Sequence, residues 1–562
     1  MSDGRKGRLL LIVAVLAVAV AARLTTLHWT PLPSTLDGFG YVALARDTLE
    51  TGVFPLTRFR ADNIVFTAVL TAVGALTGER PLYIAQPVVA VTGAASCLTA
   101  MALVKRLAQS SRWRHSRTTL AMGVVGMGLA VEGIYLRRTG QTDEEALAFL
   151  LLPLFAIAVH RLLTTERYRR RWGAVVVVLF AAFPLLHTFS SLIAALVLTG
   201  VLAAQLAGVP SRRDAVTALL TVAGFWVYMW GYYRIAERSL LEVPYVDRIS
   251  AYPGLFLAWV VVLVATLVWF QRTSARLQRV TIGGAVGLWF LTLGANALQT
   301  VFPGTQTTPA GLLVLVAAFA VPVVFAVVGL PLASRDRRLI GPVVLALLLA
   351  PIVIVYFSLT ASLTPEYYGT ALRGQTFVHL PVFVLAGIGV ASVAYRRSPS
   401  PDGGLGTPKA HSHRLATVLT VVVVVAAVAT MPIAFVNLDT LAFPTGATES
   451  QFAAATFTAD HVDEQWASDH PFSRIAALYY PGASNGTYQP VARWLGGGAE
   501  PTCPTLSRSS WGTTGAHLFP AASEKTTPAA LAEWRYENDV VYDTRSLDSV
   551  YLVRPGGNRT SC

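Results

Sequence analysis

The chain has 562 residues, of which 54% are hydrophobic and 13% are charged, and its mean hydropathy is +0.54. About a quarter of the residues in a soluble globular protein are charged, so this composition excludes a soluble core for most of the chain and indicates a multi-pass membrane protein. The formal net charge of +13 comes without a basic patch, which argues against nucleic acid as a partner.

Apolar runs long enough to cross a bilayer recur along the chain, and we count about thirteen. They cover residues 8–24, 81–104, 118–136, 144–163, 173–188, 190–208, 215–233, 254–271, 280–301, 309–332, 339–358, 377–394 and 415–436. The first run is too long for a removed signal peptide, so we expect it to stay as an anchor. A shorter run at 64–78 is expected to form a helix against the outer face. The expected fold class is therefore an α-helical polytopic membrane protein.

Lysine and arginine collect in every second loop between these runs, beginning with Arg5, Lys6 and Arg8. The positive-inside rule places these loops, and the N-terminus, in the cytoplasm. The same rule places the C-terminus outside. From Leu438 onward the chain has 13 acidic and 8 basic residues, so this part carries −5 and the remainder +18. The high pI therefore reflects membrane topology, and we expect a protein of the plasma membrane.

The segment Leu36–Pro55, LDGFGYVALARDTLETGVFP, follows the first run and has a carboxylate, Asp37, at the start of a helical pattern. Apolar and small residues fall on one side of this helix at spacings of three and four, and they are Tyr41, Leu44, Ala45, Thr48 and Leu49. Gly52 is expected to end the helix. An aspartate at a helix start is commonly an N-cap, and this alternative stands beside a chemical role for Asp37.

The segment GQTDEE at residues 140–145 puts Asp143 and Glu145 in an outer loop just before a span. Two carboxylates that are two residues apart in an irregular loop can hold one divalent cation, Mg²⁺ or Mn²⁺, which would offset the charge of a lipid phosphate. Asp37, Asp143 and Glu145 are the expected metal ligands. The alternative is that acids at a helix start only complement the helix dipole.

Two further outward-facing segments carry candidate binding residues. His187 lies in FPLLHTFSS, at the outer turn between two spans, where the alternative is a polar tip among interfacial aromatics. Glu366 and Arg373 lie in TPEYYGTALRGQ before a later span. Arg373 is the only arginine or lysine between Ser358 and Tyr395, and its forked guanidinium suits a lipid phosphate. It could equally anchor the next span at the membrane rim.

We divide the chain into a membrane domain, residues 1–437, and a small outer α+β domain, residues 438–562. A helix is expected over Ser450–Trp466, and strands are expected in RIAALYY, VVYDTR and SVYLVRP. Cys503 and Cys562 are both in this domain and could pair, whereas Cys97 lies in a span. Asn485 and Asn558 begin glycosylation sequons whose use is open.

The pattern D-x-x-x-Y-x-x-x-A-x-x-x-L-x-x-G, from Asp37 to Gly52, resembles the first outer loop of the GT-C membrane glycosyltransferases. This class includes the protein mannosyltransferases, the lipid A aminoarabinose transferases and the catalytic subunit of oligosaccharyltransferase. Asp143 and Glu145 resemble the second acidic motif of the last of these. The resemblance implies that Asp37 is catalytic and that Tyr41, Asp143, Glu145, His187, Glu366 and Arg373 bind substrate.

The sequence departs from the patterns of this family at two places, and these departures narrow the range of reactions that we expect. The C-terminal part has no WWDYG sequence, with which oligosaccharyltransferases recognise the sequon, so transfer to asparagine is not expected. Gly38 also stands where the mannosyltransferases usually carry a second acid.

The expected function is transfer of a sugar from a polyprenyl (dolichyl) phosphate donor to a lipid- or protein-linked glycan acceptor on the outer face. The alternative is a transporter or flippase of a lipid-linked sugar. Such proteins usually keep ionisable groups or internal repeats near the bilayer midplane. Here the acids and Arg373 gather at the outer rim, which favours the enzyme.

Overall fold

The structure is a computed structural model, and it describes residues 3–111, 113–165, 167–207, 212–243, 245–301, 307–335, 340–395, 411–436, 446–482, 486–518, 523–556 and 562. Three of the features expected from the sequence lie outside these residues. They are the boundary between the domains at 437 and 438, Asn485 and Asn558.

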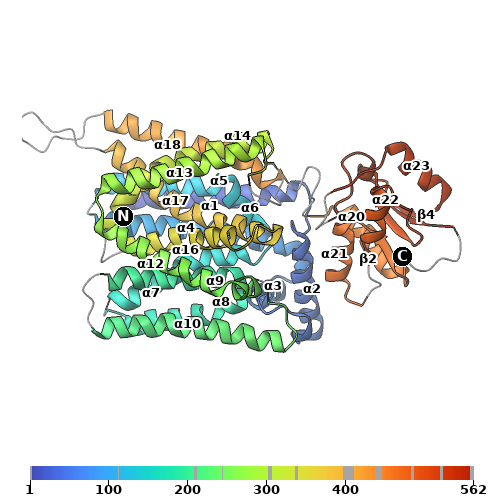
Figure 1. Ribbon diagram of the computed structural model, residues 1–562, viewed down its shortest axis with the longest axis horizontal. Coiled ribbons are helices and arrows are strands. Elements are labelled where there is room, and N and C mark those ends of the chain that lie inside the picture. The colour runs from blue at the N-terminus through green and yellow to red at the C-terminus, as the bar shows by residue number, and fades with distance from the viewer. Residues whose placement is uncertain are drawn as a thin grey trace, which may run out of the picture.

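Long helices build a bundle, and Figure 1 shows them side by side with the C-terminal domain at one end. We call this end of the bundle the domain end; α2 crosses it and the N-terminus lies at the other (Figure 1). The helices of the bundle are α1 (Asp3–Leu24), α4 (Pro81–Ser110), α5 (His115–Val131), α6 (Gly133–Gly140), α7 (Glu145–Thr164), α8 (Arg169–Leu186), α9 (Thr188–Leu206), α10 (Arg212–Arg238), α12 (Pro253–Arg272), α13 (Ala275–Leu298), α14 (Ala310–Ala318), α15 (Ala320–Arg335), α16 (Gly341–Ala361), α17 (Pro365–Ala394) and α18 (His411–Thr430). The helices of the connecting segments are η1 (Thr25–His28), α2 (Leu36–Thr51), η2 (Leu56–Arg58), α3 (Ile64–Thr77), α11 (Val246–Ala251) and η3 (Met431–Ala434).

Within the described residues, 11 helices are long and apolar enough to cross a membrane, or 12 if the bent pair α5 and α6 counts as one span. The protein is therefore a multi-pass membrane protein, with fewer clear spans than the thirteen expected. The run at 173–188 makes the difference, because it folds as α8, an 18-residue helix that begins with three arginines. The helix expected at 64–78 is confirmed as α3, Ile64–Thr77, and its place on the outer face stays a prediction.

The span formed by α5 and α6 is bent by 65° at Glu132. The carboxylate of Glu132 accepts hydrogen bonds from the backbone N–H groups of Ile134 and Tyr135 and so caps α6. Its Oε2 is also 3.0 Å from Nδ1 of His379 in α17. The break lets α6 run toward the domain end at a new angle, and there it leads into the GQTDEE segment.

The C-terminal domain is an α+β unit around a five-stranded sheet with strand order β2-β1-β3-β5-β4. β1 is parallel to β2 and β3, and β5 is antiparallel to β3 and β4. The strands are β1 (Trp466–Ser468), β2 (Gly486–Thr487), β3 (Thr505–Arg508), β4 (Asp539–Asp543) and β5 (Val550–Arg554). The helices are α20 (Glu449–His461), α21 (His470–Tyr479), α22 (Gln489–Leu495), η4 (Ser509–Gly512) and α23 (Pro528–Glu537).

Most of the elements expected in this domain are confirmed, but RIAALYY is not a strand. It belongs to α21, which begins with Pro471 in its first turn. Phe472, Ile475, Ala476 and Tyr479 are all buried at spacings of three and four, as the apolar face of a helix requires. The helix expected over Ser450–Trp466 ends earlier, at His461, because Trp466 opens β1.

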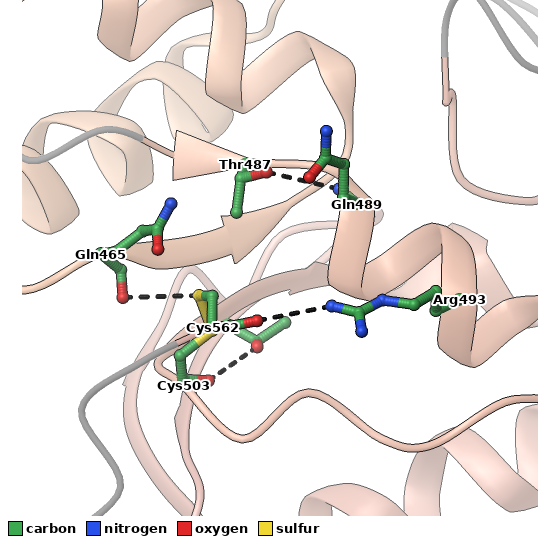
Figure 2. Close-up of a disulfide and its surroundings, with 7 residues drawn as sticks. Gln465, Thr487, Gln489, Arg493, Cys503 and Cys562 are labelled. Carbon is green, nitrogen blue, oxygen red and sulfur yellow. Dashed lines mark hydrogen bonds between the residues drawn. A yellow bond between two sulfur atoms is a disulfide. The ribbon is translucent and has the colours of Figure 1, made fainter.

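Cys503 and Cys562 form a disulfide, so the pairing left open by the sequence is confirmed (Figure 2). The bond joins the segment before β3 to the last residue of the chain, 59 residues away. Arg493 of α22 donates to the carbonyl oxygen of Cys562 at 3.5 Å. Cys97 is free and buried in the bundle.

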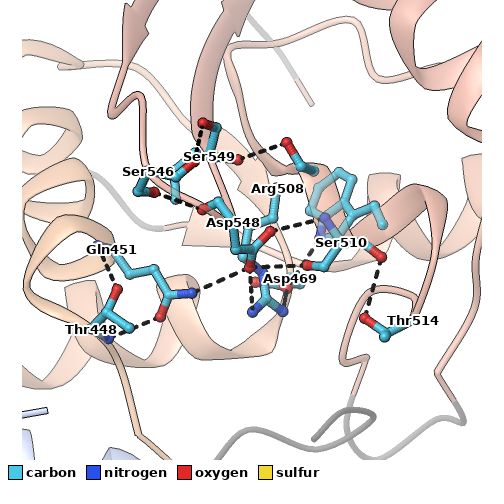
Figure 3. Close-up of polar contacts among 12 residues, drawn as sticks. Thr448, Gln451, Asp469, Arg508, Ser510, Thr514, Ser546, Asp548 and Ser549 are labelled. Carbon is cyan, nitrogen blue, oxygen red and sulfur yellow. Dashed lines mark hydrogen bonds and ion pairs between the residues drawn. The ribbon is translucent and has the colours of Figure 1, made fainter. Parts of the chain in front are cut away.

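Asp469 is fully buried in the C-terminal domain, at the end of β1 (Figure 3). Its carboxylate pairs with Arg508 and accepts a 3.1 Å hydrogen bond from Nε1 of Trp511. Arg508 also lies 3.8 Å from Asp548, whose carboxylate accepts from the N–H and the hydroxyl of Ser510. These contacts join the ends of β1 and β3, so Asp469 has a structural role.

We expect Asp469→Ala to destabilise the C-terminal domain by about 3 to 5 kcal/mol, because it removes the closer of the two carboxylates that face the buried Arg508 and the acceptor of the Trp511 indole N–H. Pulse proteolysis of the full chain in nanodiscs measures this change. Asp460→Ala is the matched control, since Asp460 is exposed on α20 and should change stability by no more than about 0.5 kcal/mol. Equal proteolysis of the two variants would contradict the structural role.

The C-terminal domain packs directly on α2, and one apolar cluster contains residues of both. The ring of Phe39 in α2 stacks on Phe452 of α20 at 5.5 Å between centroids. A Cβ atom on Gly40 would lie 3.4 Å from the side chain of Leu478 in α21, so the two helices approach closely there. This contact fixes the domain beside the start of α2, where Asp37 lies.

Candidate active site

Asp37 lies in the first turn of α2, and its side chain is 42% exposed. The N-cap is Thr35, whose side chain accepts from the N–H of Gly38, so capping does not depend on Asp37. As expected, Gly52 ends the helix with φ at +73°, a backbone angle that glycine adopts readily. Oδ1 of Asp37 accepts a 2.8 Å hydrogen bond from Nη2 of Arg474 in α21. Oδ2 makes no hydrogen bond to a described residue and stays open to a ligand.

The segment before Asp37 is hydrogen-bonded to the GQTDEE segment, more than 100 residues away in sequence. Oγ1 of Thr35 donates to the carbonyl oxygen of Thr142 at 2.6 Å. The N–H of Ser34 donates to Oγ1 of Thr142, and the N–H of Thr142 donates to Oγ of Ser34, both at 3.1 Å. A Cβ on Gly38 would lie 3.1 Å from Cβ of Thr142, so this close approach suits a glycine. The two acidic motifs are thus held side by side.

Glu145, the first residue of α7, is fully buried and faces two arginines. Arg138 of α6 lies 3.6 Å from its Oε2, and Arg373 of α17 lies 3.5 Å from its Oε1. The side chains of both arginines are partly exposed, 20% for Arg138 and 28% for Arg373. Arg373 therefore joins the acidic loop and does more than anchor a span. Its guanidinium also lies 5.6 Å from the ring of Tyr245.

Glu144 connects the acidic loop to α2 through Arg60. Nη2 of Arg60 donates to Oε1 of Glu144 at 3.2 Å and to the hydroxyl of Tyr41 at 3.0 Å. Tyr41 is buried on the apolar face of α2, as its position in the helical pattern predicts. Nε2 of His187 lies 3.9 Å from Glu144 and 3.8 Å from Glu145. His187 is thus buried in the cluster and is not an interfacial tip.

Asp62 is fully buried beside this cluster. Its Oδ2 accepts from the N–H and the hydroxyl of Thr188, at 3.1 and 2.6 Å, while Oδ1 has no hydrogen-bond partner among the described residues and lies 3.6 Å from Nε of Arg60. Ser190 lies 2.8 Å from Nδ1 of His187 and orients the ring. The start of α9 therefore positions both Asp62 and His187.

The charges in the cluster are interdependent. Burial opposes ionisation of Asp143, but its hydrogen bond with Glu144 and the nearby Arg373 outweigh burial and hold its pKa below the usual range. Burial and Asp143 together raise the pKa of Glu144 well above its usual range, despite Arg60. Burial lowers the pKa of His187 below its usual value, although the neighbouring carboxylates act in the opposite sense. His187 is therefore neutral at pH 7, and one ring nitrogen can act as an acceptor or ligand.

Asp62, Glu144 and His187 each offer an atom that could ligate a metal, and these atoms lie within 4.8 Å of one another. This set differs from Asp37, Asp143 and Glu145, the ligands expected from the sequence. Within the part of the chain that the structure describes, Oδ1 of Asp62 and Oε2 of Glu144 are buried without a hydrogen-bond partner, which costs free energy unless a cation satisfies them. Carboxylates suit Mg²⁺ and Mn²⁺, and an imidazole suits transition metals, so a divalent transition metal such as Mn²⁺ matches this mixed set. The residues present therefore fit a divalent cation.

The structure brings together Tyr41, Asp143, Glu145, His187 and Arg373, with Asp37 at the edge of the group. Glu366 is the exception, because it is exposed in the first turn of α17 and contacts none of these residues. Sequence reasoning missed Arg60, Asp62, Arg138 and Glu144 in the cluster, and Arg474 at Asp37. The FRADN segment, with charges of both signs just before α3, was the available signal for Arg60 and Asp62.

Comparison with known proteins shows the fold. No family model matches the chain, and no curated protein matches it in sequence. The oligosaccharyltransferase AglB of Archaeoglobus fulgidus, in complex with an inhibitory peptide and a dolichol-phosphate, is similar in structure with a TM-score of 0.50 at 15% identity. The match covers 85% of this chain and 64% of AglB. The apo form of the Archaeoglobus fulgidus oligosaccharyltransferase also has a TM-score of 0.50, with 14% identity and coverage of 84% and 64%.

The arabinofuranosyltransferase AftD from Mycobacteria matches with a TM-score of 0.49 at 12% identity, over 97% of this chain and 40% of AftD. The chain thus spans less than two thirds of the length of these proteins. This chain, a polytopic helical bundle with a C-terminal domain beside α2, is therefore similar in fold to AglB, and this is the fold of the GT-C membrane glycosyltransferases.

Proposed function

We propose that this protein is an inverting glycosyltransferase that moves one sugar from a polyprenyl-phosphate donor to a glycan or glycolipid acceptor. The observation that carries this proposal is the position of Asp37. It is a half-exposed carboxylate on a GT-C fold, held by Ser34, Thr35 and Thr142 beside a buried group of acids and arginines. AglB, which shares the fold, is an oligosaccharyltransferase whose structure contains a dolichol-phosphate.

The proposed transfer needs a base for the acceptor hydroxyl and a positive charge for the leaving phosphate, and the site offers a residue for each. Oδ2 of Asp37 accepts the proton of the acceptor hydroxyl while that oxygen attacks the anomeric carbon of the donor sugar. The bond from the anomeric carbon to the phosphate oxygen breaks, and its electron pair leaves with the polyprenyl phosphate. Arg138 and Arg373 stabilise the phosphate charge. A divalent cation held by Asp62, Glu144 and His187 would add positive charge near this group.

Arg474 gives the C-terminal domain a part in this site. It holds Oδ1 of Asp37 and leaves Oδ2 for the acceptor. The partly exposed rim between α2 and α21 is therefore where we place the acceptor, and the domain would contribute to its recognition.

The test is a comparison of lipid-linked sugars and glycans in cells with and without this protein. Loss of the protein should raise the amount of one polyprenyl-phosphate sugar and remove one glycan product, both measured by mass spectrometry. Purified protein in detergent should then form that product from the lipid extract of the deficient cells. Arg373→Lys should keep part of this transfer, because lysine keeps the charge and loses the fork.

A transporter of a lipid-linked sugar is the second candidate. The pair of Glu132 and His379, buried at the break of a span, favours it, because transporters place ionisable groups at broken helices. The detergent experiment separates the two functions. A transporter only moves its substrate from one compartment to another, so in detergent it forms no glycosidic bond. A glycosyltransferase still forms the product there.

We also propose that the domain end of the bundle is extracytoplasmic. A reporter fused after Arg414 is expected in the cytoplasm, and one fused after Cys562 is expected outside, because the basic loops lie at the opposite end from the C-terminal domain. Alkaline phosphatase and a cytoplasmic reporter at each site measure this. If both fusions report the same side, the orientation of the proposed active site is wrong.

A further inference from the structure

Arg23 is a fully buried arginine in the last turn of α1, within a membrane span. It makes no ion pair with a carboxylate among the described residues. A charged side chain inside a membrane bundle is costly and is usually retained for a function. The reaction proposed above does not use Arg23, so its presence needs another explanation.

The guanidinium of Arg23 binds the end of α6. Nε and Nη2 donate to Oγ1 of Thr139 at 3.1 and 2.6 Å, and Nη1 donates to the carbonyl oxygen of Ala19 at 3.0 Å. Oγ1 of Thr139 itself donates to the carbonyl oxygen of Tyr135. Thr139 is the residue before GQTDEE, so Arg23 holds the side chain of the residue at which the acidic loop begins.

Helix α4 completes this support. A Cβ on Gly93 would lie 1.9 Å from the carbonyl oxygen of Thr139 and 2.8 Å from Nε of Arg23, so only glycine lets α4 approach so closely. The amide of Gln86, also fully buried, donates to the carbonyl oxygen of Gly140 at 2.6 Å and accepts from Oγ1 of Thr142 at 2.8 Å. Three of the four residues from Thr139 to Thr142 are thus held by polar side chains of α1 and α4.

We propose that Arg23 is a positioning residue, which sets the place of the acidic loop against Asp37 from inside the bundle. One part of this inference rests on the proposed function, namely that the acids of the loop belong to the active site. Stability alone does not require a charge here. An apolar side chain of similar length would fill the same space, and buried polar groups of this kind can serve to specify one arrangement.

Arg23→Met separates positioning from stability. The methionine leaves no buried donor without a partner, because the hydroxyl of Thr139 still donates to Tyr135. We expect the thermal unfolding temperature in nanodiscs to stay equal or rise. We expect sugar transfer at equal protein level to fall by about 10- to 100-fold, as small displacements of catalytic groups do. Arg23→Lys should recover part of this loss, because one ammonium can still reach Thr139.

Hydrogen exchange provides a readout that needs no substrate. Amide protons of residues 139–145 should exchange at least about tenfold faster in Arg23→Met than in the parent protein, although the variant is no less stable. Ser96→Ala is the matched control. It removes a buried 2.6 Å contact with the hydroxyl of Tyr135 in the same region and does not touch residues 139–142. It should leave exchange in the loop and transfer unchanged.

Unchanged exchange in the loop of Arg23→Met would overturn the positioning role, whatever the fate of the proposed function. A lower unfolding temperature with exchange raised throughout the bundle would also overturn it, because it would show a general structural role. If the parent protein transfers no sugar while exchange in the loop still responds to Arg23→Met, the proposed function fails and the inference about Arg23 stands.

Discussion

Asp37→Asn should lower sugar transfer by about 100- to 10,000-fold, which corresponds to about 3 to 5.5 kcal/mol of barrier. The asparagine keeps the shape of the side chain but cannot accept the proton of the acceptor hydroxyl. The helix should be unaffected, because Thr35 and not Asp37 caps α2. Losing the ion pair with Arg474 should cost at most about 1 kcal/mol of stability, since both side chains are exposed by 40% or more. The measurement is product formation in membranes that contain equal amounts of each variant.

Asp47→Asn is the matched control for this experiment. Asp47 is an acid on the same helix, ion-paired with Arg46 and Arg58, and it makes no contact with the buried cluster. Its replacement should leave transfer within about twofold of the parent protein. Near-normal transfer by Asp37→Asn would refute the base assignment and make the acid an ordinary surface residue.

Asp62→Asn and His187→Ala should each weaken the binding of Mn²⁺ by about 10- to 100-fold. Each should also lower sugar transfer, because the cation would stabilise the leaving phosphate. Both residues supply a ligand atom to the group with Glu144, and each variant removes one of the three. Electron paramagnetic resonance of Mn²⁺ titrated into the purified protein measures the affinity directly. Because burial and Asp143 raise the pKa of Glu144 and its carboxylate must lose its proton to bind, the affinity should increase as the pH rises above the usual titration range of a glutamate.

Glu132→Gln is the control for metal binding. Glu132 forms a buried pair with His379 of the same carboxylate and imidazole chemistry, but it lies at the α5 and α6 break. Its replacement should leave Mn²⁺ binding unchanged. If the parent protein binds no more Mn²⁺ than Asp62→Asn does, the cluster holds no metal. Arg60 would then be the counter-charge for Asp62 and Glu144.

Several features could be predicted from the sequence alone because they depend on local composition. The apolar runs predicted a multi-pass bundle, since about 20 apolar residues in a row are stable only across a membrane. Asp37 and Gly52 bracketed α2 to within a residue at each end, because turn chemistry and the capacity of glycine for positive φ are local properties. The resemblance of this segment also predicted the GT-C fold that the comparison with AglB shows.

Local patterns misled at one segment of the C-terminal domain. RIAALYY alternates well enough for a strand, yet it forms part of α21 because α2 and the sheet bury one face of it. The neighbours in space decided this outcome, and these do not appear in the local sequence. The run at 173–188 was counted as a span, and the feature that sets α8 apart from the other spans, the three arginines at its start, is local sequence.

The composition of the candidate active site was decided by the tertiary structure. Ser34 and Thr35 meet Thr142 across more than 100 residues, and Arg474 reaches Asp37 across 437 residues. Asp62, Glu144 and His187 come from three separate segments that meet at the ends of α7 and α9. Asp37, Asp143, His187 and Arg373 could be named from the sequence, because a charged or ionisable residue at the rim of a membrane bundle stands out from apolar neighbours. Which of them face one another follows from helix packing and hydrogen bonds between distant segments, and no spacing along the chain encodes these contacts.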